Sequence, residues 1–222
     1  MSDQNLDLMI EPEAIAILDH YGIPYPANRF VQNADEAVWQ AEQIGYPVVL
    51  KIVSPRIIHK SDAGGVMAEL KDGEAVRAGY EDMIYRIGKA MPSIDIQGVL
   101  VCRQADPGLE VIVGASEDPV FGPTLMFGMG GIYTEILNDV SFRIVPVESL
   151  DVEEMIQEIK GYHILSGTRG KKPRDLKALA NIIQTVGRIV SERPEIKEID
   201  LNPVRLYEGG LLVLDARIYR VK

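Results

Sequence analysis

The chain has very little cysteine and no surplus of positive charge. Cys102 is the only cysteine of 222 residues, so the chain forms no intrachain disulfide and offers a metal no second thiolate. It lies in an apolar run, where we expect a buried, inert thiol. Lys and Arg number 23 against 33 Asp and Glu, giving a formal net charge of −10. A general nucleic-acid binder neutralises phosphates with surplus cations, so the composition argues against that class.

Long apolar runs are also missing. No stretch approaches the ~20 apolar residues that span a bilayer, and the first residues lack the basic-then-apolar pattern of a signal peptide. We therefore expect a cytoplasmic protein that has no membrane partner. What is present, 46% hydrophobic and 25% charged residues, is typical of a globular protein with a sizeable core.

The spacing of apolar residues predicts the helices and strands. Repeats at three and four positions predict helices over 12–20, 35–44, 74–90, 149–158 and 174–192. Apolar, β-prone runs predict strands over 47–53, 66–70, 96–102, 109–115, 124–127, 197–201 and 211–215, with a paired-strand region over 132–147. Residues 161–173, rich in Gly, Lys and Arg, are expected to form a loop. Because several strands follow one another without long helices between them, we expect antiparallel sheets covered by helices, in an α+β or mixed α/β fold.

The most informative stretch joins the predicted strands 47–53 and 66–70. The first strand carries Lys51, and the following loop ends in Gly64 and Gly65. Backbone N–H groups of such a loop can surround a phosphate, glycines allow close approach, and a lysine adds positive charge. A lysine at a strand end is, however, usually just solvated. His59 is a possible phosphoryl acceptor, although an isolated histidine is more often an ordinary surface residue.

A second candidate site lies near the C-terminus. Asp200 and Asn202 alternate along one predicted strand and therefore share a face, and Asp215 ends the next one after a turn at 208–210. A few hard oxygen ligands, completed by substrate phosphates, are how proteins hold Mg²⁺. The alternative is a solvated hairpin edge. The segment Gly128-Met-Gly-Gly131 fits neither the Walker nor the dinucleotide motif, and is either a loop needing positive φ or a ligand contact.

Six segments together resemble one family. The sequence is similar to the beta subunit of ADP-forming acetyl-CoA synthetase, among the NDP-forming acyl-CoA synthetases related to succinyl-CoA synthetase. The resemblance covers about residues 10–218, and the string around His59 is its most specific part. The segments are Tyr46-Pro-Val-Val-Leu-Lys51, Ile58-His-Lys-Ser-Asp-Ala-Gly-Gly-Val66, Glu110-Val-Ile-Val-Gly114, Asp118-Pro-Val-Phe-Gly-Pro123, Gly130-Gly-Ile-Tyr-Thr-Glu135 and Glu198-Ile-Asp-Leu-Asn-Pro203.

This resemblance implies an ATP-grasp fold, in which ADP or ATP lies between two α+β subdomains. We expect these at about 20–100 and 101–222, with the N-terminal helix 10–20 packing on the second. The resemblance also implies the roles of individual residues. Lys51 and the loop with Gly64 and Gly65 are expected to contact the phosphates, and Gln104, Ala105 and Glu110 to lie beside adenine and ribose. Asn202 and Asp215 are expected to bind Mg²⁺, with Asp200 as an adjacent acidic candidate.

The resemblance further implies a role for His59 as a transient phosphoryl carrier in an ADP-forming acetate–CoA ligase. The CoA-binding domain of the family has no match in this sequence, so we expect a separate alpha subunit and an assembly of two alpha and two beta subunits. The basic loop 169–172 could contact that partner or CoA, or be solvated. Two other functions are weighed: a stand-alone ATP-grasp carboxylate ligase, and a non-catalytic nucleotide-binding module.

Overall fold

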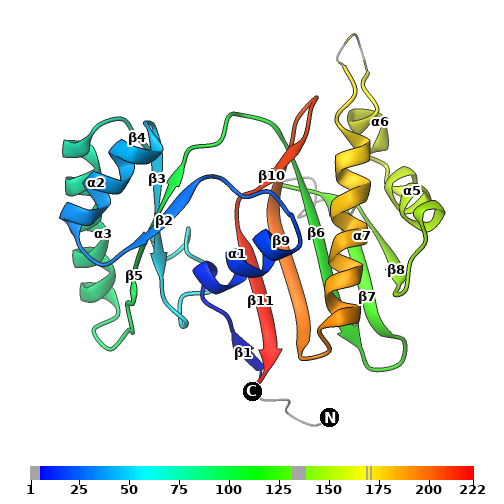
Figure 1. Ribbon diagram of the computed structural model, residues 1–222, viewed down its shortest axis with the longest axis horizontal. Coiled ribbons are helices and arrows are strands. Elements are labelled where there is room, and N and C mark those ends of the chain that lie inside the picture. Colours follow the sequence, from blue (N-terminus) through cyan, green and yellow to red (C-terminus); the bar gives the residue numbers. More distant parts are fainter. Residues whose placement is uncertain (1–5, 132–138, 169, 171) are drawn as a thin grey trace. The chain divides into compact units, whose positions relative to one another are not determined.

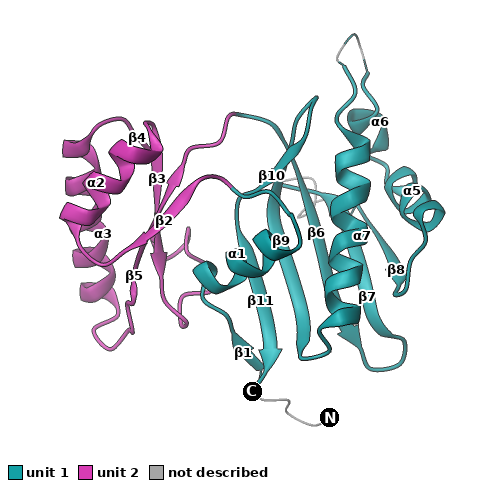
Figure 2. Ribbon diagram, in the orientation of Figure 1, with its two compact units in different colours: residues 1–25, 107–222 teal, residues 26–106 magenta. Residues whose placement is uncertain are grey.

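The computed structural model describes residues 6–131, 139–168, 170 and 172–222. The chain divides into two compact units (Figure 2): unit 1 comprises residues 1–25 and 107–222, and unit 2 comprises residues 26–106. Each unit combines one antiparallel sheet with its own helices (Figure 1). The expected α+β fold with antiparallel sheets is therefore confirmed.

Unit 2 is a four-stranded sheet whose helices α2 and α3 pack on one face. Each of these helices begins at a side chain that accepts a backbone N–H: Asn33 from Glu36 at 2.9 Å, and Asp72 from Ala75 at 2.8 Å. In spatial order the strands are β2 (Asn28–Val31), β5 (Gly98–Arg103), β3 (Val48–Val53) and β4 (Val66–Leu70), and the helices are α2 (Ala34–Ile44) and α3 (Gly73–Ala90).

Strand β3 separates the core of unit 2 from its functional candidate. Val48, Leu50 and Ile52 are fully buried in the cluster that includes α2 and α3. Because successive side chains of a strand point to opposite faces, Lys51 lies on the face that these helices do not cover. The alternation that builds the core thus also directs Lys51 away from it.

Unit 1 is built on a seven-stranded sheet. Its strand order is β1–β11–β9–β6–β7–β8, and β10 pairs separately with β9. The strands are β1 (Leu6–Leu8), β6 (Leu109–Asp118), β7 (Gly122–Met129), β8 (Val140–Ile144), β9 (Ile196–Leu206), β10 (Leu211–Val213) and β11 (Ala216–Val221). The helices are α1 (Glu11–His20), α5 (Ser149–Glu158), α6 (Tyr162–Leu165) and α7 (Leu176–Glu192).

Helix α7 lies along this sheet (Figure 1), and its apolar face packs in the core of unit 1. Leu179, Ile183, Val186 and Ile189 are fully buried, at the three- and four-residue spacing that the sequence shows. Helix α7 contacts β6, β7 and β9, and α1 and α5 join the same core. The opposite face of the sheet has no helix among the described elements of this core.

The structure confirms the five long predicted helices and corrects the shorter elements. Strands β1 and β2 and helix α6, which lies within the predicted loop 161–173, are too short for a periodic signal. The predicted strand 211–215 ends at Val213, and Asp215 precedes a further strand, β11, that the prediction missed. Of the predicted region 132–147, strand β8 is seen. Residues 132–138, with Glu135, lie outside the described part of the chain, as do Arg169 and Lys171.

Candidate functional site

Lys51 is a predicted nucleotide contact with a buried side chain. Its side chain is only 9% exposed, and in register it lies between Val66 on β4 and Leu100 on β5. A charged group this deeply placed requires interactions that compensate for its lost hydration. The position therefore differs from the solvated strand end that the sequence left open.

The loop after β3 is anchored at both of its ends. Near its beginning, Ile57 inserts into the core of unit 2 and is 6% exposed. At its end, the carbonyl of Gly65 accepts the N–H of Ile52 at 2.8 Å, and the N–H of Gly65 donates to the carbonyl of Lys60 at 2.7 Å. His59 lies between these anchors and is exposed to solvent. Its imidazole is thus presented at the surface of unit 2 by a loop that is fixed on either side.

The conformation and packing of this loop favour glycine at both positions, independently of any ligand. Gly64 has φ of +68°, a left-handed conformation that favours glycine. A Cβ on Gly65 would lie 2.4 Å from Cγ2 of Ile52, so only a hydrogen fits there. Their contact with phosphates stays a prediction.

The predicted adenine and ribose contacts Gln104 and Ala105 lie next to the passage from unit 2 to unit 1, between Asp106 and Pro107. Just before it, the side-chain oxygen of Gln104 accepts the N–H of Glu69 at 2.6 Å, and the Gln104 backbone N–H donates to the carbonyl of Pro47 at 3.1 Å. Glu69 has φ of +60°, so Gln104 stabilises an uncommon backbone conformation. Ala105 follows in a segment without regular structure.

In unit 1, the sheet face opposite the helices brings together the predicted polar residues of β6 and β9. Ile199 and Leu201 point into the core, so Asp200 and Asn202 point away from it. The register of β9 against β6 shifts between Val111 and Val113, which adds one residue to β9. Beyond this shift the buried side chains are those of Val204 and Leu206. Arg205, which lies between them, therefore points to the same outer face as Asp200 and Asn202.

Glu110 on β6 is directly opposite Arg205 on β9 in the sheet. The Arg205 guanidinium donates to the Glu110 carboxylate at 2.6 Å, and both side chains are about one-third exposed or less. This charge-assisted hydrogen bond fixes the carboxylate in one orientation. A carboxylate has further lone pairs, so Glu110 keeps the capacity to accept a hydroxyl.

Asp200 and Asp215 come together around Arg217, by a route that the sequence did not predict. The turn at 208–210 pairs β10 with the far end of β9, whereas β11 places Arg217 opposite Asp200. The Arg217 guanidinium lies 3.7 Å from Asp200 and 3.6 Å from Asp215. The backbone N–H of Asn202, the third predicted ligand, donates to the backbone carbonyl of Asp215 at 3.1 Å and so holds the two residues next to each other.

The donor set fits a hard divalent cation that brings its own anionic ligand. Asp200, Asn202 and Asp215 offer two carboxylates and one amide oxygen, the oxygen donors that Mg²⁺ prefers. Within the described ranges, no cluster of three or more His, Cys, Asp or Glu residues is arranged for a metal. Phosphate and water oxygens would therefore have to complete the shell around these residues.

Arg205 and Arg217 are the two residues of this face that the sequence prediction missed. Each is opposite one of the predicted acidic residues across a strand pair, Glu110 or Asp200. Arg217 alternates with the apolar residues Ala216 and Ile218, but this short alternation does not by itself predict a strand. The register shift that turns Arg205 outward has no signal in the sequence pattern.

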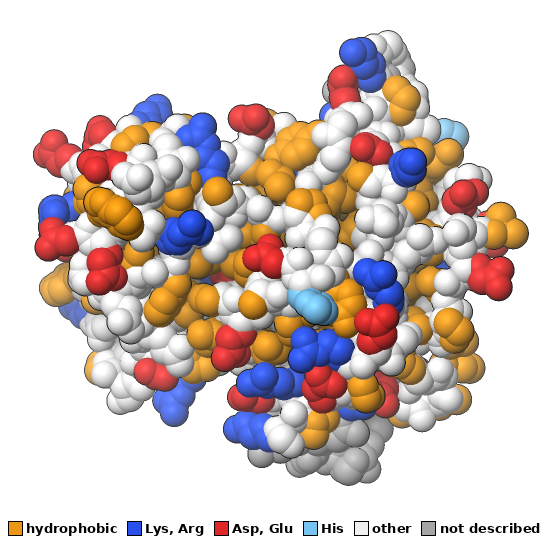
Figure 3. Space-filling model, in the orientation of Figure 1, with side chains coloured by type: hydrophobic (Ala, Val, Ile, Leu, Met, Phe, Trp, Pro, Cys, Tyr) orange, Lys and Arg blue, Asp and Glu red, His pale blue; other side chains and the backbone are white. Residues whose placement is uncertain are grey.

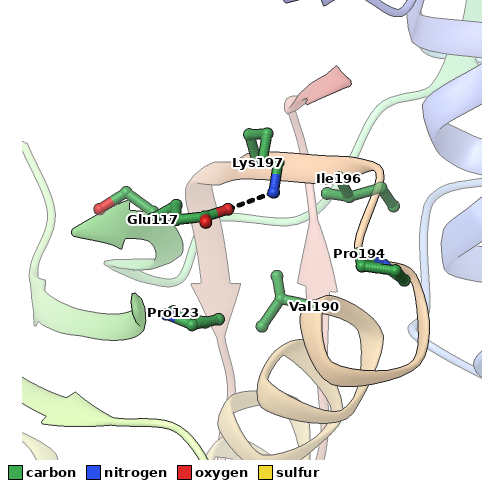
Figure 4. Close-up of a pocket in the computed structure, with 7 residues that line it drawn as sticks. Glu117, Pro123, Val190, Pro194, Ile196 and Lys197 are labelled. Atoms are coloured by element: carbon green, nitrogen blue, oxygen red, sulfur yellow. Dashed lines mark hydrogen bonds and ion pairs between the residues drawn. The ribbon is translucent and has the colours of Figure 1, made fainter. Parts of the chain in front are cut away.

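Three cavities in unit 1 are lined by none of the predicted site residues. One of about 110 Å³ lies beside the Lys197–Glu117 ion pair (Figure 4) and is smaller than the usual small-molecule site. The other two, of about 340 and 390 Å³, lie against α7. Acidic and basic side chains are interspersed on the face seen in Figure 3. No helix among the described residues is long and apolar enough to cross a membrane.

Comparison with known proteins decides the family. The profile of the ATP-grasp domain matches residues 1–219. The beta subunit of ADP-forming acetate–CoA ligase I of Pyrococcus furiosus is 51% identical over 210 residues, which cover 95% of this chain and 90% of that protein. The chain belongs to the ATP-grasp family of ADP-forming acetate–CoA ligase beta subunits. The resemblance noted in the sequence is confirmed.

Solved structures of an ATP-grasp relative agree with this assignment. Acetyl-coenzyme A synthetase 1 of Ca. Korarchaeum cryptofilum, in complex with coenzyme A and Ca-AMPCP, superposes with a TM-score of 0.93 at 45% identity, covering 96% of this chain and 93% of that chain. The same protein with coenzyme A and Mg-AMPPCP gives a TM-score of 0.83 at 44% identity and the same coverage. Its phosphohistidine segment points towards the nucleotide binding site in that complex.

Proposed function

We propose that the chain is the nucleotide-binding, phosphoryl-transferring beta subunit of an ADP-forming acyl-CoA synthetase, with acetyl-CoA as the expected substrate. The reaction is acyl-CoA + ADP + phosphate giving acid + CoA + ATP, and it is reversible. The observation that carries the proposal is the 51% identity to a beta subunit of this enzyme over almost the full length of both chains. The exposed His59 next to the strand of Lys51 supports it.

His59 is the proposed phosphoryl carrier. A lone pair of its neutral imidazole attacks phosphorus, a P–N bond forms, and the phosphoryl group leaves its former carrier. A terminal oxygen of ADP then attacks the same phosphorus, the P–N bond breaks, and the electron pair returns to His59. Lys51 offsets the negative charge of the nucleotide phosphates during the transfer.

Asn202 and Asp215 are the proposed ligands of Mg²⁺, with Asp200 beside them. When bound, the cation offsets phosphate charge and orients the nucleotide. Gly64, Gly65, Gln104 and Ala105 are proposed to contact the nucleotide mainly through the backbone, and Glu110 to accept a ribose hydroxyl. The fixed orientation of Glu110 beside Arg205 supports its role.

The acyl-CoA chemistry requires a partner. Relatives of this length carry the name "subunit beta", which implies an alpha subunit. We infer that the alpha subunit binds CoA, selects the acid and transfers the phosphoryl group to His59, in an assembly of two alpha and two beta subunits.

The deciding experiment tests His59 in the complex with the alpha subunit. In the His59→Ala variant, we expect ATP formation from acetyl-CoA, ADP and phosphate to fall by roughly 10³-fold or more, because the nucleophile is lost. ADP binding to the beta subunit should stay near the wild-type value. His163, an exposed histidine on α6, provides the matched control, and His163→Ala should keep full activity.

Labelling separates the proposal from the two other functions. With γ-labelled ATP, the wild-type chain should carry acid-labile phosphate on His59, and the His59→Ala chain should carry none. A stand-alone ligase would instead turn over ATP, an acid and an amine without the partner and without His59. A non-catalytic module would bind nucleotide and take up no label. Full activity of His59→Ala in the complex would refute the proposed role.

A further inference from the structure

Arg217 lies where the two carboxylates of the proposed metal site meet. It is opposite Asp200 across the β9–β11 pair, two residues after Asp215. Its two terminal nitrogens are divided between these residues, Nη1 at 3.7 Å from Asp200 and Nη2 at 3.6 Å from Asp215. One guanidinium thus neutralises charge on both carboxylates at once.

The contacts of Arg217 are electrostatic rather than hydrogen-bonded. Both distances exceed the usual hydrogen-bond range of about 2.7–3.2 Å, whereas Arg205 reaches Glu110 at 2.6 Å on the same sheet face. The Nε atom of Arg217 is buried and has no hydrogen-bond partner in the described part of the chain. A structural arginine normally uses its planar donors in short, paired hydrogen bonds to carboxylates. Arg217 does not, so another group can replace it at these carboxylates.

The charges of the cluster explain what this arrangement does. Among these three side chains, Asp200 and Asp215 contribute two negative charges and Arg217 one positive charge. A bare divalent cation that approaches the two carboxylates is repelled by the guanidinium beside them. A cation that arrives with nucleotide phosphates brings compensating negative charge, which also interacts favourably with Arg217.

We propose that Arg217 is an internal counter-ion that makes binding of a divalent cation depend on the nucleotide. It keeps the two carboxylates together when no cation is bound, and it disfavours the cation alone relative to the cation–nucleotide complex. Arg217 is therefore a positioning residue of the metal site. This inference rests on the proposed function, because it assigns a role relative to the proposed Mg²⁺ ligands.

The test measures binding of Mn²⁺, a paramagnetic probe for Mg²⁺, to the full-length chain with and without ADP. Arg217→Met removes the charge and keeps the length of the side chain, and Arg217→Lys keeps the charge. Arg220→Met, on the same strand β11, makes the same change in net charge away from the cluster. Free Mn²⁺ in each titration is measured by electron paramagnetic resonance.

Without ADP, Arg217→Met should bind Mn²⁺ about tenfold more tightly than the wild type, as expected for removal of one partly screened charge at this distance. Its gain in Mn²⁺ affinity on adding ADP should fall correspondingly. Arg217→Lys and Arg220→Met should resemble the wild type.

Unchanged or weaker Mn²⁺ binding by a folded Arg217→Met would overturn the inference. Loss of folding in Arg217→Met while Arg217→Lys folds would also overturn it, because the charge would then be needed for the fold. The proposed function is tested separately by the wild type. If the wild-type chain binds no Mn²⁺ together with ADP, the proposed metal site itself is wrong.

Discussion

Replacement of Gly65 by alanine tests whether packing, rather than a ligand, requires the glycine. The added Cβ would lie 2.4 Å from Cγ2 of Ile52 and 3.1 Å from the carbonyl oxygen of Lys60. Ile52 is fully buried and donates its N–H to the Gly65 carbonyl at 2.8 Å, so neither residue can move without disturbing the other. Overpacking of this kind costs about 1–3 kcal/mol. Restriction of the unfolded chain returns about 0.4–1 kcal/mol.

We therefore expect Gly65→Ala to lower the free energy of unfolding by about 1–2 kcal/mol. The only tryptophan, Trp39, lies on α2 in the same unit, so its fluorescence during urea titration reports the unfolding of unit 2. Gly88 provides the control, because it lies inside α3 and a Cβ there meets nothing within 4 Å. Gly88→Ala should stabilise the chain by about 0.5–1 kcal/mol.

The essential result is that the free energy of unfolding falls in Gly65→Ala and rises in Gly88→Ala. If Gly65→Ala proved as stable as the wild type, the steric reasoning would be refuted. If it were stable but bound ADP poorly, the glycine would serve the ligand and not the packing against Ile52.

Three further predictions concern Asp175 at the start of α7, the buried Phe127 compared with the exposed Phe142, and the buried Lys51. Asp175 begins α7, and the N–H groups of Ala178 and then Gly210 hold the pKa of its carboxyl below the usual value. Asp175→Ala should lower the free energy of unfolding by about 0.5–2 kcal/mol at neutral pH. This difference should persist above the unfolded-state pKa of about 4 and disappear as the pH falls through the folded-state pKa, measured by urea titrations at several pH values. Phe127→Ala should cost about 3–5 kcal/mol because the ring is fully buried, whereas Phe142→Ala, at a 54% exposed side chain, should stay within about 0.5 kcal/mol; equal costs would contradict this. Lys51→Met should weaken ADP binding by roughly tenfold or more in calorimetric titrations, and removal of Mg²⁺ with EDTA should weaken it in the wild type as well, since each positive charge stabilises the phosphates. Unchanged affinity in either experiment would exclude that group from the nucleotide site.

The sequence predicts those parts of the fold in which a pattern repeats several times. Helix α7 and strand β3 each place one set of apolar residues on a single face, and both are recovered within two residues of their observed ends. The strands β1 and β2 have three and four residues, too few to establish a period. Strand β11 is long enough, but its alternating arginines and tyrosine weaken the apolar signal.

For the candidate site, the sequence predicts which residues share a strand face and not which strands are neighbours. The period of two correctly places Asp200 and Asn202 together on β9. Their approach to Asp215 depends on pairing between β9 and β11, which is a property of the whole sheet. Arg217 was missed for the same reason, because its importance arises only from what lies opposite it.

The additional residue in β9 has a consequence for how this strand tolerates changes in length. Upstream of the shift, one alternation directs Ile199 and Leu201 inward; downstream, the opposite alternation directs Val204 and Leu206 inward. Deleting Pro203 would remove the additional residue and leave a regular ladder, in which these four residues still point inward and Arg205 still points outward. A deletion within either regular half would instead reverse the alternation and turn inward-facing residues away from the core. We therefore expect natural variants of this chain to tolerate the loss of one residue next to Pro203 and to reject single-residue deletions elsewhere in β9.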